Sequence, residues 1–525
     1  MSEAPILKDT TRSTGREALQ KNIQAAMALA EAIRSTLGPK GLDKLLIDDE
    51  GRTLVTNDGV TVLETAKVEH PVAKMMINTS STQDRIAKDG TTSTVILAGE
   101  MLQNAWQLIL QGIHPSTIAR GYRKSEQYLL QCMSEIKFDS DDKMKSSVVK
   151  TSLAGKGHSS MQETIARISL DAVQMVAGID STIDISKIKL VSQTGGKVED
   201  SKVFRGLMIP KKRISSDMHK EVNSGKIILI DGGLEKSNVA TDLKLNVTTV
   251  GVLESFRQEE RNMLKRQVDN LVEHGVTVLA CRESIDDEIK NYLSENGIQA
   301  FRRVARSDLN MLARVCDATL VNSVDSLTSN DLGSFIVSKN TTIEGKDFWI
   351  VEGDGKAATI IAKASTVDVV GEVERCFDDS LGVSVQLVEN GSVVCGGGAS
   401  YVALARRLRR YAETIPGREQ LAVEAYADAI EVIVRVLAEN AGIDPITTLL
   451  DVVAKQTNTN SDYIGIDLST GAPSDMVKLG ILEPEGIVKQ AIIGATEVAI
   501  SILRIDDVLW AKQEMQMPDM PDDEM

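Results

Sequence analysis

The chain has helical patterning towards both ends and alternating strand and helix patterning in the middle, and this distribution constrains its fold most. Between residues 226 and 362, short runs rich in Val, Ile and Thr alternate with amphipathic stretches. Such alternation predicts a compact α/β domain with parallel strand pairing. The 525 residues are enough for two to four domains, each with its own core.

Spacing of apolar residues predicts the individual elements. Steps of three and four predict helices over residues 16–37, 115–136 and 421–440. Asn57-Asp58-Gly59 is a hairpin-like turn signal between two short β-rich runs, so we expect a strand over residues 60–62. The central strands are expected at residues 226–231, 248–255, 276–283, 298–304, 319–324, 347–353 and 358–364, and the central helices at 257–274, 285–295 and 307–316.

Residues 84–99 contain the most informative polar turn. Its centre, Asp89-Gly90-Thr91-Thr92-Ser93, places one carboxylate, one glycine and three hydroxyls directly before an apolar run with helical potential. Glycine lets backbone N–H groups approach an anion, hydroxyls and a helix N-terminus add donors, and a carboxylate can hold Mg²⁺. A simple helix cap with a turn glycine explains the same five residues, and the segment taken alone favours that interpretation.

Further glycine-rich polar turns lie at residues 38–41, 155–157 and 396–398. The first does not match G-x-x-x-x-G-K-[ST], which excludes a Walker P-loop there. Such turns can converge on one anionic ligand, although spacing alone does not show that they do. Residues 353–358 form a loose G-x-G-x-x-A, but strands are expected on both sides, so we interpret them as a hairpin turn. A Rossmann-type oxidoreductase therefore lacks its fingerprint.

Composition excludes several classes of protein. A formal net charge of −16 argues against a general nucleic-acid binder, which would cluster Lys and Arg. The five cysteines are scattered without a C-x-x-C pair, which excludes the usual zinc patterns and a disulfide framework and favours a reducing compartment. The N-terminus has no signal-peptide core, and no window reaches about 18 apolar residues. We expect a soluble, cytoplasmic protein.

Seven motifs, in order along nearly the whole chain, carry a resemblance to one family. They are TLGPKGLDKLLID (36–48), TNDGVTVL (56–63), KDGTTSTVILAGE (88–100), TSLAGKG (151–157), EVERCFDDSL (372–381), VVCGGGASYVALARRLR (393–409) and GILEPEGIVKQAI (480–492). This succession resembles the group II chaperonins, namely the thermosome subunits of archaea and the related subunits of the eukaryotic cytosolic chaperonin.

The resemblance implies a multidomain fold of α and α/β domains. A helical equatorial ATP-binding domain would comprise residues 1–142 and 396–525, a small intermediate domain 143–207 and 363–395, and an α/β apical domain 208–362. A helical protrusion near 239–261 would be a built-in lid, so no separate co-chaperonin lid is expected. The partners implied are identical or paralogous subunits in a double ring of eight or nine per ring, and unfolded or partly folded polypeptides. No nucleic acid and no membrane are expected.

The resemblance also implies an ATP hydrolase with the cofactors ATP and Mg²⁺. Asp89 would coordinate Mg²⁺ and Lys156 would sense the γ-phosphate. Asp379, assisted by Asp48, would activate the attacking water, once the intermediate domain closes onto the nucleotide. The other nucleotide-binding residues implied are Leu37, Gly38, Pro39 and Gly41; Asp58 and Gly59; Gly90, Thr91, Thr92 and Ser93; Gly397 and Gly398 at the nucleoside; and Glu483 near the ribose.

Lys88 departs from the family pattern, which has glycine at this position. If the backbone there needs a positive φ, lysine costs roughly 1–3 kcal/mol and places a side chain beside the phosphates. Lys88 would then either pair with a phosphate or slow turnover. The alternative to an ATP-driven folding chamber is therefore a structural or regulatory ring subunit with weak or absent ATP hydrolysis.

Overall fold

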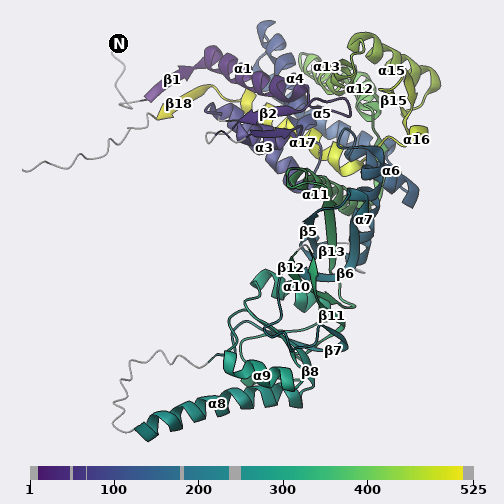
Figure 1. Ribbon diagram of the computed structural model, residues 1–525. Coiled ribbons are helices and arrows are strands. Elements are labelled where there is room, and N and C mark those ends of the chain that lie inside the picture. The colour runs from purple at the N-terminus through teal and green to yellow at the C-terminus, as the bar shows by residue number, and fades with distance from the viewer. Residues whose placement is uncertain are drawn as a thin grey trace, which may run out of the picture. The chain divides into compact units, whose positions relative to one another are not determined.

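A computed structural model describes residues 10–47, 51, 53–66, 68–177, 183–235, 250–343 and 345–511. The chain forms two compact units (Figure 1). Unit 1 joins residues 1–157 to residues 390–525, and unit 2 comprises residues 158–389. The chain therefore enters unit 2 from unit 1 and returns to it. The finer, three-domain division stays a prediction.

Unit 1 is mainly helical. Its N-terminal elements are β1 (Thr10–Thr14), α1 (Gly15–Arg34), β2 (Lys44–Ile47), β3 (Thr53–Thr56), α2 (Gly59–Thr65), α3 (Pro71–Ala87), α4 (Thr91–Leu110), α5 (Pro115–Ile136), β4 (Phe138–Asp139) and α6 (Asp142–Ser152). Its C-terminal elements are β14 (Ser392–Cys395), α12 (Ala399–Ala412), α13 (Glu419–Ile430), α14 (Val432–Asn440), α15 (Pro445–Thr459), β15 (Ile464–Ile466), β16 (Pro473–Asp475), α16 (Met476–Leu479), β17 (Leu482–Pro484), α17 (Glu485–Leu503) and β18 (Asp507–Ala511).

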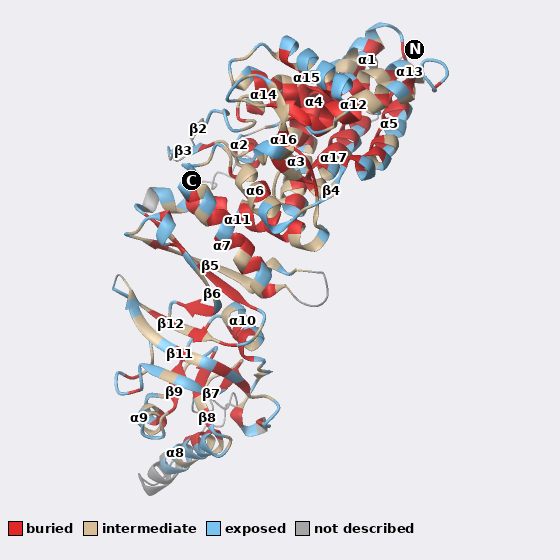
Figure 2. Cartoon of the chain, turned by 90° about the vertical axis from the view of Figure 1, so that its right-hand side faces the viewer, coloured by how far each residue is buried: buried red, intermediate tan, exposed pale blue. Residues whose placement is uncertain are grey.

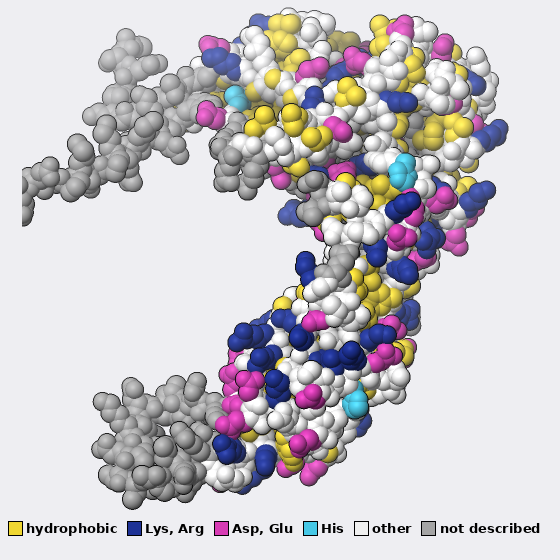
Figure 3. Space-filling model, in the orientation of Figure 1, with side chains coloured by type: hydrophobic (Ala, Val, Ile, Leu, Met, Phe, Trp, Pro, Cys, Tyr) yellow, Lys and Arg dark blue, Asp and Glu magenta, His cyan; other side chains and the backbone are white. Residues whose placement is uncertain are grey.

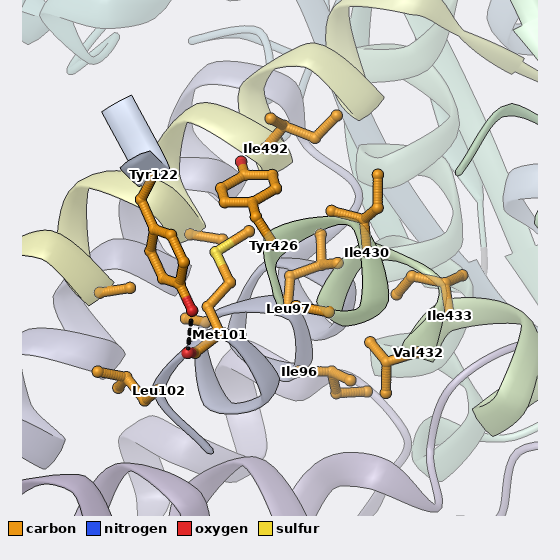
Figure 4. Close-up of a cluster of buried hydrophobic side chains, with 14 of the residues drawn as sticks. Ile96, Leu97, Met101, Leu102, Tyr122, Tyr426, Ile430, Val432, Ile433 and Ile492 are labelled. Atoms are coloured by element: carbon orange, nitrogen blue, oxygen red, sulfur yellow. Dashed lines mark hydrogen bonds between the residues drawn. The ribbon is translucent and has the colours of Figure 1, made fainter. Parts of the chain in front are cut away.

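Helix α4 runs through the core of unit 1 and packs against α1, α3, α13 and α17 (Figure 2). Nearby, the Tyr122 hydroxyl donates to the Met101 carbonyl at 2.7 Å, and the Tyr122 and Tyr426 rings meet edge to face at 5.2 Å (Figure 4). Buried aromatic hydroxyls need such partners because an unpaired polar group in a core is costly. Helix α4 is thus held by helices from both parts of the chain that form unit 1.

Helix α17 is long and apolar enough to cross a membrane, with a mean hydropathy of 1.5, but 61% of that window is buried inside the protein. It packs against α3, α4 and α5. Burial on several sides explains the composition, since a helix surrounded by protein needs apolar residues all round.

Two small ribbons lie at the surface of unit 1. β1 pairs antiparallel with β18, joining the chain ends, and β2 pairs antiparallel with β3. The β2–β3 ribbon exposes large apolar side chains: Leu45 is 63% exposed, Ile47 66% and Val55 56%. Apolar residues grouped on an exposed ribbon indicate an interaction surface.

Unit 2 is an α/β unit. It comprises α7 (Ser159–Val176), β5 (Ile188–Thr194), β6 (Lys202–Ile209), β7 (Glu221–Ile230), α8 (Val250–Glu273), β8 (Val276–Cys281), α9 (Asp287–Glu295), β9 (Gln299–Phe301), α10 (Arg306–Cys316), β10 (Leu320–Val321), β11 (Gly333–Ile343), β12 (Lys346–Glu352), β13 (Ala358–Ala364) and α11 (Val367–Asn390). On the face of unit 2 shown in Figure 3, acidic and basic side chains are interspersed.

The described strands of unit 2 form a nine-stranded sheet in the order β5-β13-β6-β12-β11-β7-β8-β9, with β10 beside β7. Only β5/β13, β7/β8, β8/β9 and β7/β10 are parallel pairs. The predicted α/β class is confirmed, but the expectation of parallel pairing holds only in part. The central β6, β12 and β11 pair antiparallel, and β5, β6 and β11 were missed.

Several local predictions are wrong. Asp58 accepts hydrogen bonds from the Thr61 N–H and hydroxyl at 2.9 and 2.6 Å and so caps α2, which replaces the predicted turn and strand. The predicted strand over 248–255 is helical from Val250 onwards. β12 and β13 pair with opposite edges of β6 and not with each other, so residues 353–358 do not form the predicted hairpin turn. Of the predicted lid, residues 239–261, residues 239–249 lie outside the described part of the chain.

Candidate functional site

Asp89 lies in the short connection between α3 and α4. The Gly90 N–H donates to Asp89 Oδ1 at 2.7 Å, and Gln83 Nε2 donates to the Asp89 carbonyl at 2.9 Å. Gly90 has a φ of 78°, and a Cβ there would lie 2.8 Å from Ile487 Cγ2. Glycine is therefore needed at this position for two independent reasons. Helices from both ends of the chain hold the Asp89 backbone.

The Asp89 carboxyl has charged neighbours from three segments. Burial raises its pKa above the usual range, and the negative charges of Asp58 and Asp84 act in the same direction. The hydrogen bond from Gly90 and the positive charge of Lys156 oppose this shift. The net effect is a raised pKa, and a cation close to the carboxylate would shift it back and stabilise the ionised form.

The N-terminus of α4 faces this position. Thr91, Thr92 and Ser93 are the first three residues of a helix of 20 residues. In an α-helix the first N–H groups have no acceptor within the helix, and the helix dipole adds partial positive charge. A Cβ on Gly59 would lie 2.5 Å from Thr92 Oγ1, so the N-terminus of α2 packs directly against this turn.

The glycine turn at residues 38–41 lies beside the turn that carries Lys156. The Gly41 N–H donates to the Gly38 carbonyl at 2.9 Å, which closes the first turn. A Cβ on Gly155 would lie 3.3 Å from the Pro39 Cα, so the two backbones are in contact. Asn440 Nδ2 donates to the Leu37 carbonyl at 2.9 Å. These two turns, which are far apart in the sequence, therefore lie against each other in unit 1.

The three glycines before α12 pack against other parts of unit 1. A Cβ on Gly397 would lie 2.6 Å from Met476 Sδ, and one on Gly398 would lie 2.2 Å from Val434 Cγ2. Their φ angles are 59° and 73°. Close approach of backbone and side chains thus explains both glycines without a ligand, and their nucleoside contact stays a prediction.

Glu483 lies beside the same turn, because β17 pairs with β14 and places it opposite Val394. A Cβ on Gly396 would lie 3.0 Å from Glu483 Oε1. Burial and the negative charge of Asp89 raise the pKa of Glu483 to about 7. Burial, Glu483 and Asp89 also raise the pKa of Tyr401. Glu483 and Asp89, which are far apart in the sequence, therefore belong to one site.

Glu483→Gln is expected to stabilise the ligand-free protein above pH 7 and to have little effect at pH 4.5. A carboxyl whose folded pKa is about 7 and whose ordinary pKa is 4.5 loses stability as the pH rises between these values. The full difference is roughly 3 kcal/mol at pH 8. Urea unfolding of both proteins at pH 4.5 and pH 8 measures it.

Glu485→Gln is the matched control for this prediction. Glu485 lies on the same segment and forms an ion pair with Lys137 at 3.1 Å, so its removal is not expected to stabilise the protein at pH 8. An equal effect of Glu483→Gln at both pH values would show that the carboxyl does not titrate in this window.

A sequence model of the TCP-1/cpn60 chaperonin family matches residues 29–513. The chain belongs to this chaperonin family. It is 42% identical over 511 residues to a thermosome subunit of Methanopyrus kandleri, covering 96% of this chain and 93% of that protein. A thermosome subunit of Pyrococcus horikoshii is 41% identical over 521 residues, covering 97% and 94%. The thermosome subunit beta of Thermoplasma acidophilum is 41% identical over 517 residues, covering 97% and 95%. These similarities confirm the predicted group II chaperonin.

The two predicted catalytic residues of this chaperonin, Asp379 and Asp48, are not among the residues of unit 1 described above. Asp379 is on α11 and belongs to unit 2, whereas Asp89 and Lys156 belong to unit 1. Asp48 lies outside the described residues. Their roles stay predictions.

The structure adds residues to the chaperonin's site that sequence reasoning missed. Gln83 holds the Asp89 carbonyl, and Tyr401 is buried beside Glu483 and Asp89. The sequence did not indicate a role for Gln83, because a single amide side chain in an amphipathic helix is compatible with many different contacts. Tyr401 lies in one of the seven motifs, in the first turn of α12, but its burial beside Glu483 and Asp89 arises only in the tertiary structure.

Proposed function

We propose that this chaperonin subunit binds Mg²⁺-ATP in unit 1 and hydrolyses it to drive the folding of non-native polypeptides. The observation that carries the proposal is the convergence on Asp89 of the α4 N-terminus, Lys156 and the turn at residues 38–41. Turns from distant parts of the chain meet where an anion, and the cation that accompanies it, would be accommodated.

The phosphates would be bound by backbone donors and by one side-chain cation. The N–H groups of Thr91, Thr92 and Ser93 lie at the positive end of α4, where anions are favoured. Lys156 is close enough to Asp89 to lower its pKa, so its ammonium group would reach the same phosphates. Gly38, Pro39 and Gly41 would line the phosphates from the neighbouring turn.

Asp89 fits a Mg²⁺ ion that is bound together with phosphates. In the described part of the chain no group of three or more His, Cys, Asp and Glu side chains could hold a metal ion. Mg²⁺ commonly uses only one or two carboxylates together with phosphate oxygens and water. Bound there, Mg²⁺ would supply positive charge that neutralises the phosphate oxygens and favours ionised Asp89.

The remaining residues of the proposed site follow from the resemblance. Leu37, Asp58 and Gly59 would complete the nucleotide pocket, Gly397 and Gly398 would contact the nucleoside, and Glu483 would lie near the ribose. When ionised, the Glu483 carboxylate would accept a hydrogen bond from a ribose hydroxyl. Asp379 would take a proton from the attacking water, assisted by Asp48.

We further propose that the protein assembles into a double ring in the cytoplasm, with residues 208–362 binding clients and residues 239–261 acting as the lid. The relatives are named as subunits. The exposed apolar ribbon β2–β3 supports assembly, because burial against a neighbouring subunit would remove Leu45, Ile47 and Val55 from water. Eight- or nine-fold rings, and identical or paralogous subunits, fit these observations equally.

A catalytically silent subunit is not favoured. Lys88 adopts a left-handed conformation, with φ 57° and ψ 7°, at the C-terminus of α3, so the backbone accommodates this side chain. A non-glycine residue there costs about 1 kcal/mol relative to glycine. The sequence has Asp48, Asp89, Lys156 and Asp379, and a subunit freed from catalysis would need none of the four.

The test of the proposed function is turnover by the purified wild-type assembly. We expect Mg²⁺-dependent ATP hydrolysis, ATP-dependent refolding of a chemically denatured client, and double-ring particles in electron micrographs. EDTA should abolish turnover. Wild-type particles that bind clients but hydrolyse no ATP would overturn the enzymatic part of the proposal.

A further inference from the structure

Lys88 places a lysine side chain directly before the carboxylate of the proposed site. Its backbone ends α3, with the N–H donating to the Asp84 carbonyl at 2.9 Å and a φ of 57°. Lysine is unfavourable in this conformation, where glycine costs nothing. Strained backbone that persists in a folded protein clusters at active sites and ligand clamps. Lys88 therefore carries a backbone cost that a functional contact of its side chain would offset.

The ammonium group of Lys88 is held by a weak partner. Lys88 Nζ lies 3.6 Å from Asp84 Oδ2, and both side chains are 38% exposed. An ion pair of this length and exposure contributes little free energy. The ammonium group can therefore exchange Asp84 for a stronger anion at little cost.

The surrounding charges favour such an exchange. Asp58 and Asp84 repel the charge of Asp89, and Lys156 is the cation that opposes them. A nucleotide adds several negative charges to this group of acids. A second ammonium group from Lys88 would offset part of that repulsion.

The geometry of the chain allows Lys88 to reach the phosphates. Adjacent Cα atoms are about 3.8 Å apart, so Lys88 starts next to Asp89. Its flexible four-carbon stem carries three donors that rotate freely. Its ammonium group lies 3.6 Å from Asp84 Oδ2, and the charge of Asp84 acts on Asp89, so the side chain ends close to the proposed site.

We propose that Lys88 is a phosphate-binding residue of this subunit, paired with Asp84 in the absence of nucleotide and with a phosphate in its presence. The inference rests on the proposed function and names a residue that binds at the same site. Lysine in place of the family's glycine would then increase the affinity for phosphate, and this gain would offset the backbone strain.

The test measures equilibrium binding of AMP, ADP and a non-hydrolysable ATP analogue to the assembled protein by calorimetry, at low and high salt. Lys88→Met removes the charge and keeps a side chain at positive φ. We expect affinity for the ATP analogue to fall about fivefold at low salt, as for one partly exposed charge pair. The loss should be smaller for ADP, negligible for AMP, and strongly reduced at high salt.

Three further variants separate charge from structure. Lys88→Arg keeps the charge and should retain wild-type affinity. Lys88→Gly removes the charge and relieves the backbone strain, and its affinity should fall as much as that of Lys88→Met. Lys88→Gly therefore still tests the role of the charge if Lys88→Met fails to fold. Arg85→Met, at an exposed position on the same helix, is the matched control and should bind like the wild type.

The outcomes distinguish this inference from the proposed function. If Lys88→Met and Lys88→Gly both bind the nucleotides with wild-type affinity, the inference is overturned and the proposed nucleotide site is unaffected. Equal losses for AMP and the ATP analogue would also overturn it, because they would indicate a change unrelated to the phosphates. Absence of any nucleotide binding by the wild type would overturn the proposed function itself.

Discussion

Asp379→Ala is expected to lower the rate of ATP hydrolysis by about 10²–10⁴-fold, the usual effect of losing a group that positions and deprotonates the attacking nucleophile. Binding of the ATP analogue should be unchanged, because the proposed phosphate and metal contacts all come from unit 1. Steady-state phosphate release, measured together with calorimetric binding, separates the two effects.

The neighbouring acid provides the control for Asp379→Ala. Asp378 is exposed on the same helix, α11, and carries the same charge. Asp378→Ala should therefore keep wild-type turnover. If both variants hydrolyse ATP at the wild-type rate, Asp379 is not the water-activating residue. If Asp379→Ala also abolishes binding, the defect is structural.

Asp89→Asn is expected to lower Mg²⁺-dependent hydrolysis by about 10³-fold or more, since a bound metal supplies several kcal/mol of charge stabilisation in phosphoryl transfer. The amide can still accept the Gly90 hydrogen bond, so the loop should keep its conformation. Phosphate release at a series of Mg²⁺ concentrations measures the loss of the metal contact.

The same substitution should act on stability in the opposite direction. Burial and neighbouring acids raise the pKa of Asp89, so its ionised form destabilises the ligand-free fold at neutral pH. Asp89→Asn should then raise the urea midpoint of the ligand-free protein while reducing turnover. Asp142→Asn, whose side chain is 89% exposed, should change neither quantity. Loss of stability together with activity would contradict the assigned role of Asp89.

Local sequence signals predicted those elements whose ends carry their own caps. Helix α5 begins and ends at the predicted residues, 115 and 136, because Pro115 pre-sets the first helical turn and the apolar spacing is regular. The signals were wrong where two local readings compete. Asn57-Asp58-Gly59 resembles a turn, but Asp58 caps α2 through Thr61. The predicted helix over 421–440 is divided at Glu431 into α13 and α14.

The sequence by itself determined the family, the mixed helical and α/β character and the glycine-rich turn around Asp89, because these depend on composition, periodicity and ordered motifs. Only the tertiary structure decided that β6, β12 and β11 pair antiparallel, that Gly155 lies against Pro39, and that Glu483 shares an electrostatic environment with Asp89. Such pairings are set by long-range packing, which brings together residues whose local sequences contain no information about one another. Burial, and with it the pKa of a carboxyl, exists only once that packing is complete.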